Sequence, residues 1–186
     1  MSAILEAASQ LFDRGGATTT TIAQRAGVSI GSLYEYFRDK DAILDSLVDR
    51  HVREAEAQLH AALDGIEAVP GTLAAAIEAL VTAIVAMHGD RPGLHRRIVA
   101  FGVGRSSIRR RIDEAERRFA ERLGTLLRRH PDVHVPDPLL AARLVATSTN
   151  ALVHRHVERP DDRDDVLVAE LTRLWTGYLR GPSPGR

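Results

Sequence analysis

Hydroxyl-bearing side chains are concentrated in residues 18–37, which read TTTTIAQRAGVSIGSLYEYF. A hydroxyl group both donates and accepts hydrogen bonds, so such a cluster suits recognition of a polar surface. Tyr34 and Tyr36 carry their hydroxyls on long flat rings, while Gly31 and Ser32 leave little bulk beside them. This combination fits the groove of a DNA duplex better than it fits a protein core.

Histidine is the other residue type whose spacing could imply chemistry, and the chain has 8. His154 and His156 are two residues apart and would diverge on a helix, while Pro131 breaks the four-residue spacing of His130 and His134. His88 and His95 lie on either side of a break in the pattern. No pair has the helical spacing of a zinc site with a supporting carboxylate, and no nucleophile with its base stands out. The sequence therefore predicts no metal, no cofactor and no catalytic residue.

Two short helices must position the hydroxyl cluster. Ile22, Ala23 and Ala26 form one apolar stripe, Thr18 or Thr19 can cap that helix, and Gly27 can end it. Ser29 can cap a second helix, in which Leu33 and Phe37 face the first. Two helices joined by a tight turn with a glycine form a helix-turn-helix. The alternative, a helical pair that only packs inside an all-helical protein, leaves the outward tyrosines and small residues unexplained.

At these residues the chain resembles the DNA-binding segment of TetR-family transcriptional regulators. The match rests on Thr18-Thr19, Ile22-Ala23, 26–29, Gly31 and on further residues at 33–34, 36–37 and 40–44, and residues 4–12 join it. It covers about the first 45 residues, whereas the remainder resembles the family only in size, helical content and order. The resemblance implies that residues 29–36 enter the major groove.

The resemblance also assigns contacts. Tyr36 and Lys40 would hold phosphates, with Thr18 or Thr19 adding contacts at the start of the first helix. The residues nearest the bases would be Thr20, Ile30, Gly31, Ser32 and Tyr34, with Ser29 at the start of the helix that enters the groove. No Arg, Asn or Gln lies on that face of the second helix, so specificity would depend on DNA shape, hydroxyls and thymine methyl groups.

Composition sets the limits of this interpretation. The chain has 186 residues, 44% of them hydrophobic, with no cysteine and a formal net charge of zero. A basic footprint for DNA is therefore missing, and the first fifty residues are mildly acidic. Many family members carry a basic arm before the first helix, which this sequence lacks. No apolar run reaches about 18 residues and no signal peptide is apparent, so we expect no membrane partner and a cytoplasmic location.

The rest of the chain predicts helices only. We expect a first helix over about 2–14, with one apolar face formed by Ile4, Leu5, Ala8, Leu11 and Phe12. Asp39 should cap a long helix over residues 40–64. After a break at 65–71, further helices are expected over 72–88, 92–101, 106–129, 139–157 and, after Pro160, to about 179. Gly102 and Gly104 favour a helix junction over a phosphate loop, because no strand precedes them. The arginines of residues 106–129 are interleaved with acids, which favours a solvated helix face over a second nucleic-acid surface.

The predicted fold is all-α, with about nine helices. A three-helix head (residues 1–45) is joined by the long helix to a helical effector-binding and dimerisation domain (46–180), with a disordered tail (181–186). Candidate residues of the effector pocket are Met87, Phe101, Phe119, Asn150 and Trp175, although each also suits an ordinary core. By family position the last two helices would form a homodimer through Leu144, Ser148, Leu152, Leu167, Leu171 and Leu174, unless these faces only complete the monomer core.

The predicted function is that of a homodimeric regulator that represses transcription from a palindromic operator and is released by a small-molecule effector. An activator, or a regulator without a ligand, is the first alternative. A helical enzyme or protein-interaction module that retains the head is the second.

Overall fold

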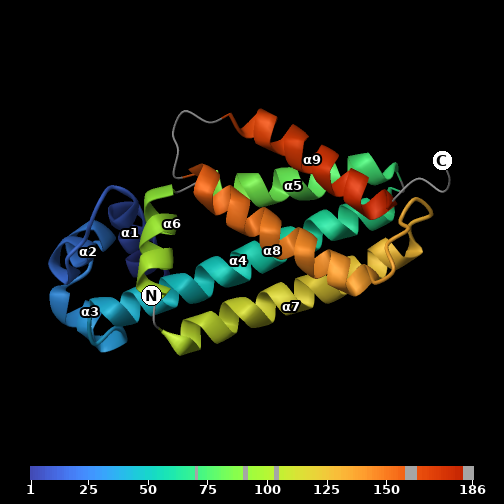
Figure 1. The fold of residues 1–186 in the computed structure, drawn as a ribbon. Helices are drawn as coiled ribbons and strands as arrows, with labels where there is room; N and C mark the ends of the chain where they lie inside the picture. The colour runs from blue at the N-terminus through green and yellow to red at the C-terminus, as the bar shows by residue number, and fades with distance from the viewer. Residues whose placement is uncertain (70, 90–91, 103–104, 158–162, 182–186) are drawn as a thin grey trace. The chain divides into compact units, whose positions relative to one another are not determined.

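The structure is a computed structural model that describes residues 1–69, 71–89, 92–102, 105–157 and 163–181. Within these ranges the chain forms nine helices and no strand (Figure 1). Their bounds are α1 (Ser2–Asp13), α2 (Thr19–Ala26), α3 (Ile30–Tyr36), α4 (Lys40–Ala68), α5 (Leu73–Gly89), α6 (Pro92–Gly102), α7 (Ser106–Arg129), α8 (Pro138–Val157) and α9 (Asp164–Arg180). The predicted all-helical class is confirmed.

One predicted boundary is wrong. Residues 65–71 were expected to break the chain, but α4 continues through Gly65 to Ala68. A single glycine inside a helix costs only about 1 kcal/mol relative to alanine. Leu63 is fully buried and Ile66 packs against the same core, so tertiary contacts on both sides of Gly65 outweigh that cost. Of the predicted tail, residues 182–186 lie outside the described ranges.

The chain forms two compact units, each built from two segments. The head unit comprises Met1–Glu54 and Arg91–Ile112, and the C-terminal unit comprises Ala55–Asp90 and Asp113–Arg186. These units differ from the division after residue 45 that the sequence suggested, because α6 and the start of α7 belong with the head. The functional boundary at residue 45 stays a prediction.

The head unit has its own apolar core. The face of α1 predicted from its spacing is buried, with Ile4, Ala8 and Phe12 each 2% exposed or less. Ile22 of α2 and Leu33 of α3 pack in the same cluster. The other core residues come from the start of α4 and from α6 and α7: Ile43, Leu44, Leu47, Val48, Leu94, Ile98 and Ile108.

A hydrogen-bonded junction between α1 and α6 explains why α6 belongs to the head. The Asp13 carboxylate accepts hydrogen bonds from the backbone N–H groups of Gly93 (2.9 Å) and Leu94 (3.1 Å), which are unpaired donors at the start of α6. A Cβ atom on Gly93 would lie 2.0 Å from the Asp13 carbonyl oxygen, so only glycine fits this approach. This junction has no local signal along the chain, because its partners are 80 residues apart.

In the C-terminal unit, α5 packs against both α8 and α9 (Figure 1). Small residues such as Ala141 and Ala142 of α8 are fully buried and allow a close approach between helices. Trp175 of α9 also lies in this core, where its indole N–H donates to the Thr149 hydroxyl at 2.9 Å. That bond satisfies the polar atom of an otherwise apolar side chain.

Arginines of α7 pair with acids of α4 within each unit. In the head unit Arg111 bonds to Asp45 (2.7 Å) and to Asp49. In the C-terminal unit Arg118 bonds to Glu56 (2.6 Å). These partners hold the pKa of Arg111 above, and the pKa of Glu56 below, their usual values. The arginines of α7 thus bind acids of α4 within each unit, in addition to a pair within α7 between Arg117 and Glu121 (2.7 Å), so part of the face predicted as solvated contributes to helix packing.

Candidate DNA-binding surface

The start of α2 is fixed by a reciprocal pair of threonines. The Thr18 hydroxyl accepts from the backbone N–H of Thr21 at 3.1 Å, and the Thr21 hydroxyl accepts from the N–H of Thr18 at 2.9 Å. This is a capping box in which threonine replaces the usual acidic or amide residue. Of the two candidates for the cap, Thr18 is therefore the one that acts.

Gly27 ends α2 and sets the turn. Its φ of 70° and ψ of 27° are left-handed values that most residues avoid. The N–H of Val28 then bonds to the Ala23 carbonyl at 3.0 Å, which satisfies a carbonyl at the end of the helix. The predicted stop at Gly27 is confirmed.

The second helix begins at a cap of the same kind. The Ser29 hydroxyl accepts from the Ser32 N–H at 3.0 Å, as predicted, and lies 2.9 Å from the Ser32 hydroxyl. Leu33 is fully buried and Phe37 is 4% exposed, so one side of α3 is anchored in the head core. The opposite side of this short helix is consequently held in a fixed direction.

That opposite side is exposed and carries the residues singled out from the sequence. Ile30, Tyr34 and Tyr36 are 42%, 50% and 59% exposed, large values for such side chains. The hydroxyls of Tyr34 and Thr19 lie 3.2 Å apart, which joins the outer surfaces of α2 and α3. Spacing could not have found this pair, because the two residues lie on different helices. Thr20, Gly31 and Lys40 are exposed as well, while Ser32 is partly buried.

Lys40 begins the next helix beside this surface. The Asp39 carboxylate accepts from the Ala42 N–H at 2.7 Å and caps α4, as its position predicted. Arg38 pairs with that same carboxylate at 3.1 Å. Lys40 has no ion pair among the described residues. The surface formed by α2, α3 and the start of α4 thus offers hydroxyls, an ammonium group and apolar side chains on a rigid frame.

Two family models match the chain. The model described as "Bacterial regulatory proteins, tetR family" matches residues 4–47, and the one described as "Tetracyclin repressor-like, C-terminal domain" matches residues 72–179. The chain belongs to the TetR family. It is a DNA-binding transcriptional regulator, and the helix-turn-helix recognised from its residues is the DNA-binding part of a TetR-family protein.

Solved TetR-family structures share the whole fold. A regulator from Streptomyces coelicolor is 25% identical, with a TM-score of 0.60 and 96% of each chain covered. A TetR/AcrR-family regulator from Thermobifida fusca is 22% identical, with a TM-score of 0.69 over 100% of this chain and 98% of that one. FadR from Bacillus subtilis, solved with stearoyl-CoA, is 18% identical, with a TM-score of 0.69 over 95% and 97%. A search of curated proteins found no significant match.

The residues predicted for an effector pocket are divided between the two units, so their grouping in one pocket stays a prediction. Phe119 and Trp175 are core residues of the C-terminal unit, and Asn150 donates to the Glu116 carboxylate at 3.1 Å. Phe101 instead packs against the core of the head unit. Met87 is partly buried in α5.

The residues predicted for a dimer surface divide into two groups. Leu144, Leu152 and Leu174 are 43%, 42% and 53% exposed, and Ser148 is partly buried. Leu171 is only 3% exposed, and Leu167 packs against the same core. Leu167 and Leu171 therefore complete the core of their own chain, because they occupy the inner side of α9.

A buried polar cluster in the C-terminal unit was not anticipated. His88 of α5 is 2% exposed, its Nδ1 lies 2.7 Å from the Ile84 carbonyl, and its ring meets that of His154 with centroids 4.6 Å apart. Burial lowers the pKa of His88, whereas burial and the nearby Asp113 raise the pKa of Glu116. Because these groups come from three helices, no local spacing signals them.

No single helix in the described part of the chain is both long and apolar enough to cross a membrane. Among the described residues, one pair of helical segments, Leu73–His88 and Gly93–Gly102, reaches the necessary length and composition when the two are taken together across a bend.

Proposed function

We propose that this TetR-family regulator represses transcription from a palindromic operator as a homodimer, in the cytoplasm, and is released by a small molecule. The observation that carries the DNA-binding part is the exposed face of α3, anchored by Leu33 and capped by Ser29. Such a helix can enter the major groove, where the four base pairs differ in their hydrogen-bonding groups.

The exposed side chains divide naturally between phosphates and bases. Lys40 and Tyr36, at the edges of the surface, would hold phosphates and set the register of the head on the duplex. Thr20, Ile30, Gly31 and Tyr34 would lie nearest the bases. The Thr18 hydroxyl accepts from the Thr21 N–H and donates to the Thr21 hydroxyl, and the Ser29 hydroxyl accepts from the Ser32 N–H, so both hydroxyls serve first to cap their helices.

Exposed apolar residues on α8 and α9 support the homodimer. On α8, Leu140, Leu144 and Leu152 are each more than 40% exposed, and they recur at multiples of four residues on one face. On α9, Leu174 and Tyr178 repeat that pattern at 53% and 39%. A twofold pairing of these faces would bury them and present two heads to two half-sites, as a palindromic operator requires.

Release by a ligand is supported by a neighbour of the same fold. FadR of Bacillus subtilis binds stearoyl-CoA in its solved structure. A ligand that favours one arrangement of a dimer by its differential affinity would change the spacing of the two heads, and with it the affinity for DNA. A regulator without a ligand would lack this release step, and an activator would differ in the effect of its DNA binding on transcription.

Fluorescence anisotropy on DNA from upstream of the protein's own gene tests the DNA-binding role. Wild type would be compared with Tyr36→Phe and Lys40→Gln across salt concentrations, with Arg128→Gln as control for the loss of one exposed charge in the C-terminal unit. We expect Lys40→Gln to weaken binding about threefold to tenfold and to reduce the salt slope by about 1, as for one phosphate contact. Equal affinities of Lys40→Gln and the control would contradict the assigned surface.

A further inference from the structure

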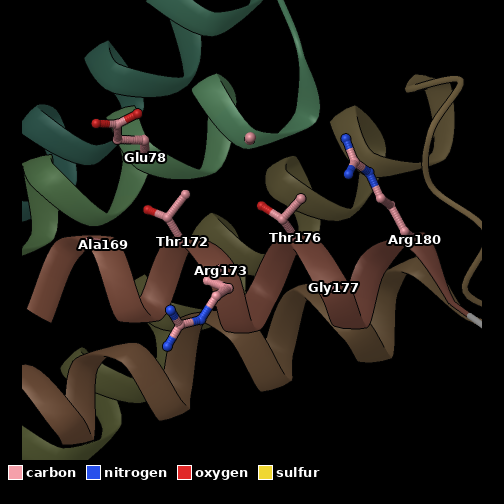
Figure 2. A pocket seen from close by; sticks show the side chains of 8 residues that line it. Glu78, Ala169, Thr172, Arg173, Thr176, Gly177 and Arg180 are labelled. Atoms are coloured by element: carbon pink, nitrogen blue, oxygen red, sulfur yellow. The ribbon is translucent and has the colours of Figure 1, made fainter.

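A pocket of about 530 Å³ lies between α5 and α9 in the C-terminal unit (Figure 2). Helix α5 contributes Ala74 and Glu78, and α9 contributes two threonines, two arginines and two small residues. Its volume falls in the range of about 300–1,000 Å³ that is usual for small-molecule sites. The pocket is separate from the DNA-reading residues, all of which belong to the head unit.

Helix α9 has three distinct faces. Leu171, Trp175 and Leu179, four residues apart, form the core face. Leu174 and Tyr178 form the exposed apolar face assigned above to the dimer. The pocket lies along the third face, which carries polar and small residues at successive turns: Ala169, Thr172, Arg173, Thr176, Gly177 and Arg180. This face therefore needs a role other than core packing.

Two hydroxyls on this face lack a partner. Neither Thr172 Oγ1 nor Thr176 Oγ1 makes a hydrogen bond to the described residues, although both atoms are buried and Thr176 as a whole is only 7% exposed. Figure 2 shows both side chains rising from α9 toward α5 on the pocket side. A buried hydroxyl without a hydrogen bond is unfavourable. Threonine in a helix populates two χ1 rotamers, so either hydroxyl can turn to meet a bound group.

Opposite charges stand on either side of these hydroxyls. In Figure 2, Glu78 and Arg180 lie toward opposite ends of the pocket with Thr172 and Thr176 between them. Neither has an ion-pair partner among the described residues, whereas Arg173 pairs with Glu170. Glu78 and Arg180 are both exposed, so water solvates either charge when it is unpaired, and a ligand with one charge only would gain a single ion pair. A ligand with both charges would gain two ion pairs.

The other residues that line the pocket are small and largely apolar. Ala74, Ala169 and Gly177 contribute no polar side chain, and the two threonines add methyl groups. A Cβ built on Gly177 would contact nothing within 4 Å, so this part of the wall is open. A short chain of methylene groups would contact these residues without leaving a polar atom unpaired.

We propose that this pocket binds a small zwitterion, with an ammonium group at one end, a carboxylate at the other and a short aliphatic spacer. The Glu78 carboxylate accepts hydrogen bonds from the ammonium group. The Arg180 guanidinium donates to the ligand carboxylate, and a threonine hydroxyl adds a further donor. This proposal goes beyond the proposed function because it names a site and a class of ligand. Binding at this site can be measured without DNA, so the two proposals can fail separately.

Isothermal titration calorimetry on the full-length protein tests the site. The probes are the ω-amino acids from glycine to 6-aminohexanoate, with hexanoate and hexylamine as partners that carry one charge each. We expect at least one ω-amino acid to bind with a saturable 1:1 isotherm, and each single-charge partner to bind at least about tenfold more weakly. The proposal is overturned if no ω-amino acid binds, or if hexanoate binds as tightly as 6-aminohexanoate.

Three variants and one control locate the binding. Glu78→Gln and Arg180→Gln should each weaken binding about tenfold or more, while Arg128→Gln, an exposed arginine outside the pocket, should not. Thr176→Val keeps the shape but removes the unpaired hydroxyl. It should raise the melting temperature of the free protein and weaken ligand binding, a combination that structural damage does not produce. Wild-type affinity in Arg180→Gln would place any observed binding elsewhere and overturn the proposal.

Discussion

At the scale of single residues, the hydroxyls of the head divide into those that cap helices and those that are exposed. Those of Thr18, Thr21 and Ser29 close the starts of α2 and α3 by accepting from backbone N–H groups. Thr20 and Tyr36 are exposed and form no such bond. The abundance of hydroxyls that suggested DNA recognition in the sequence thus also reflects the capping of two very short helices.

Removing the cap of α2 should lower stability without altering the exposed surface. Thr18→Ala leaves the Thr21 N–H without its acceptor, so we expect the free energy of unfolding to fall by about 1 kcal/mol. Chemical denaturation followed by circular dichroism measures this change. Thr20→Ala, at an exposed position two residues along, is the control and should shift the free energy by less than about 0.5 kcal/mol. Equal losses in both variants would contradict a capping role for Thr18.

Buried His88 should make stability depend on pH. Burial lowers the pKa of His88 below the ordinary value of 6.5. Between the folded pKa and pH 6.5, the unfolded chain therefore binds a proton at His88 more readily than the folded chain does. The contribution of His88 to stability is therefore complete above pH 6.5 and is lost as the pH falls from 6.5 toward the folded pKa. The raised pKa of Glu116 acts in the opposite direction, because the folded chain then holds a proton more readily than the unfolded chain does.

The His88→Gln variant isolates this contribution. Its free energy of unfolding, measured by urea denaturation between pH 7.5 and 5.5, should fall less steeply with decreasing pH than that of wild type. His134→Gln, which removes an exposed imidazole, controls for the loss of one histidine. An unchanged slope in His88→Gln would mean that this residue is not the group responsible.

At the scale of helices, the sequence predicted what is determined locally. The caps Thr18, Ser29 and Asp39 and the stop at Gly27 each act within four residues, so their patterns were sufficient. Contacts between residues that lie far apart along the chain could not be predicted from the sequence. The capping of α6 by Asp13 and the cluster around His88 and Asn150 bring together residues from separate helices.

The approach of α1 to α6 gives a test at this scale. In Gly93→Ala the new Cβ would lie 2.0 Å from the Asp13 carbonyl oxygen, so the two helices must separate. We expect a loss of about 1–3 kcal/mol in the free energy of unfolding, typical of overpacking. Gly65→Ala is the matched control, since its Cβ meets nothing within 4 Å inside α4. Gly65→Ala should instead raise the free energy of unfolding by about 0.5–1 kcal/mol. If both variants changed the free energy of unfolding in the same direction, the account of Gly93 would be wrong.

At the scale of the whole molecule, the proposed function requires a second copy of the chain. One head presents only a seven-residue helix, α3, to the groove. Such a small contact cannot by itself supply the affinity of a specific complex, which commonly buries about 1,000–2,500 Å² of protein surface. Two heads related by a twofold axis double the contact and require a symmetric site. The exposed leucines of α8 and α9 are the surface through which we expect the two chains to pair.

Leu174→Lys and Leu144→Lys separate pairing from folding. Both leucines are exposed in the single chain, at 53% and 43%, so their replacement should leave the melting temperature of a monomer little changed. Buried across a twofold axis, each lysine would face the same interface of its partner and remain unpaired, which strongly disfavours the dimer. Analytical ultracentrifugation should show wild-type dimers and variant monomers, and operator affinity should fall more than tenfold. Val69→Lys, at a 76% exposed site of the same type, should remain dimeric. Variants that stay dimeric with full affinity would move the interface away from α8 and α9.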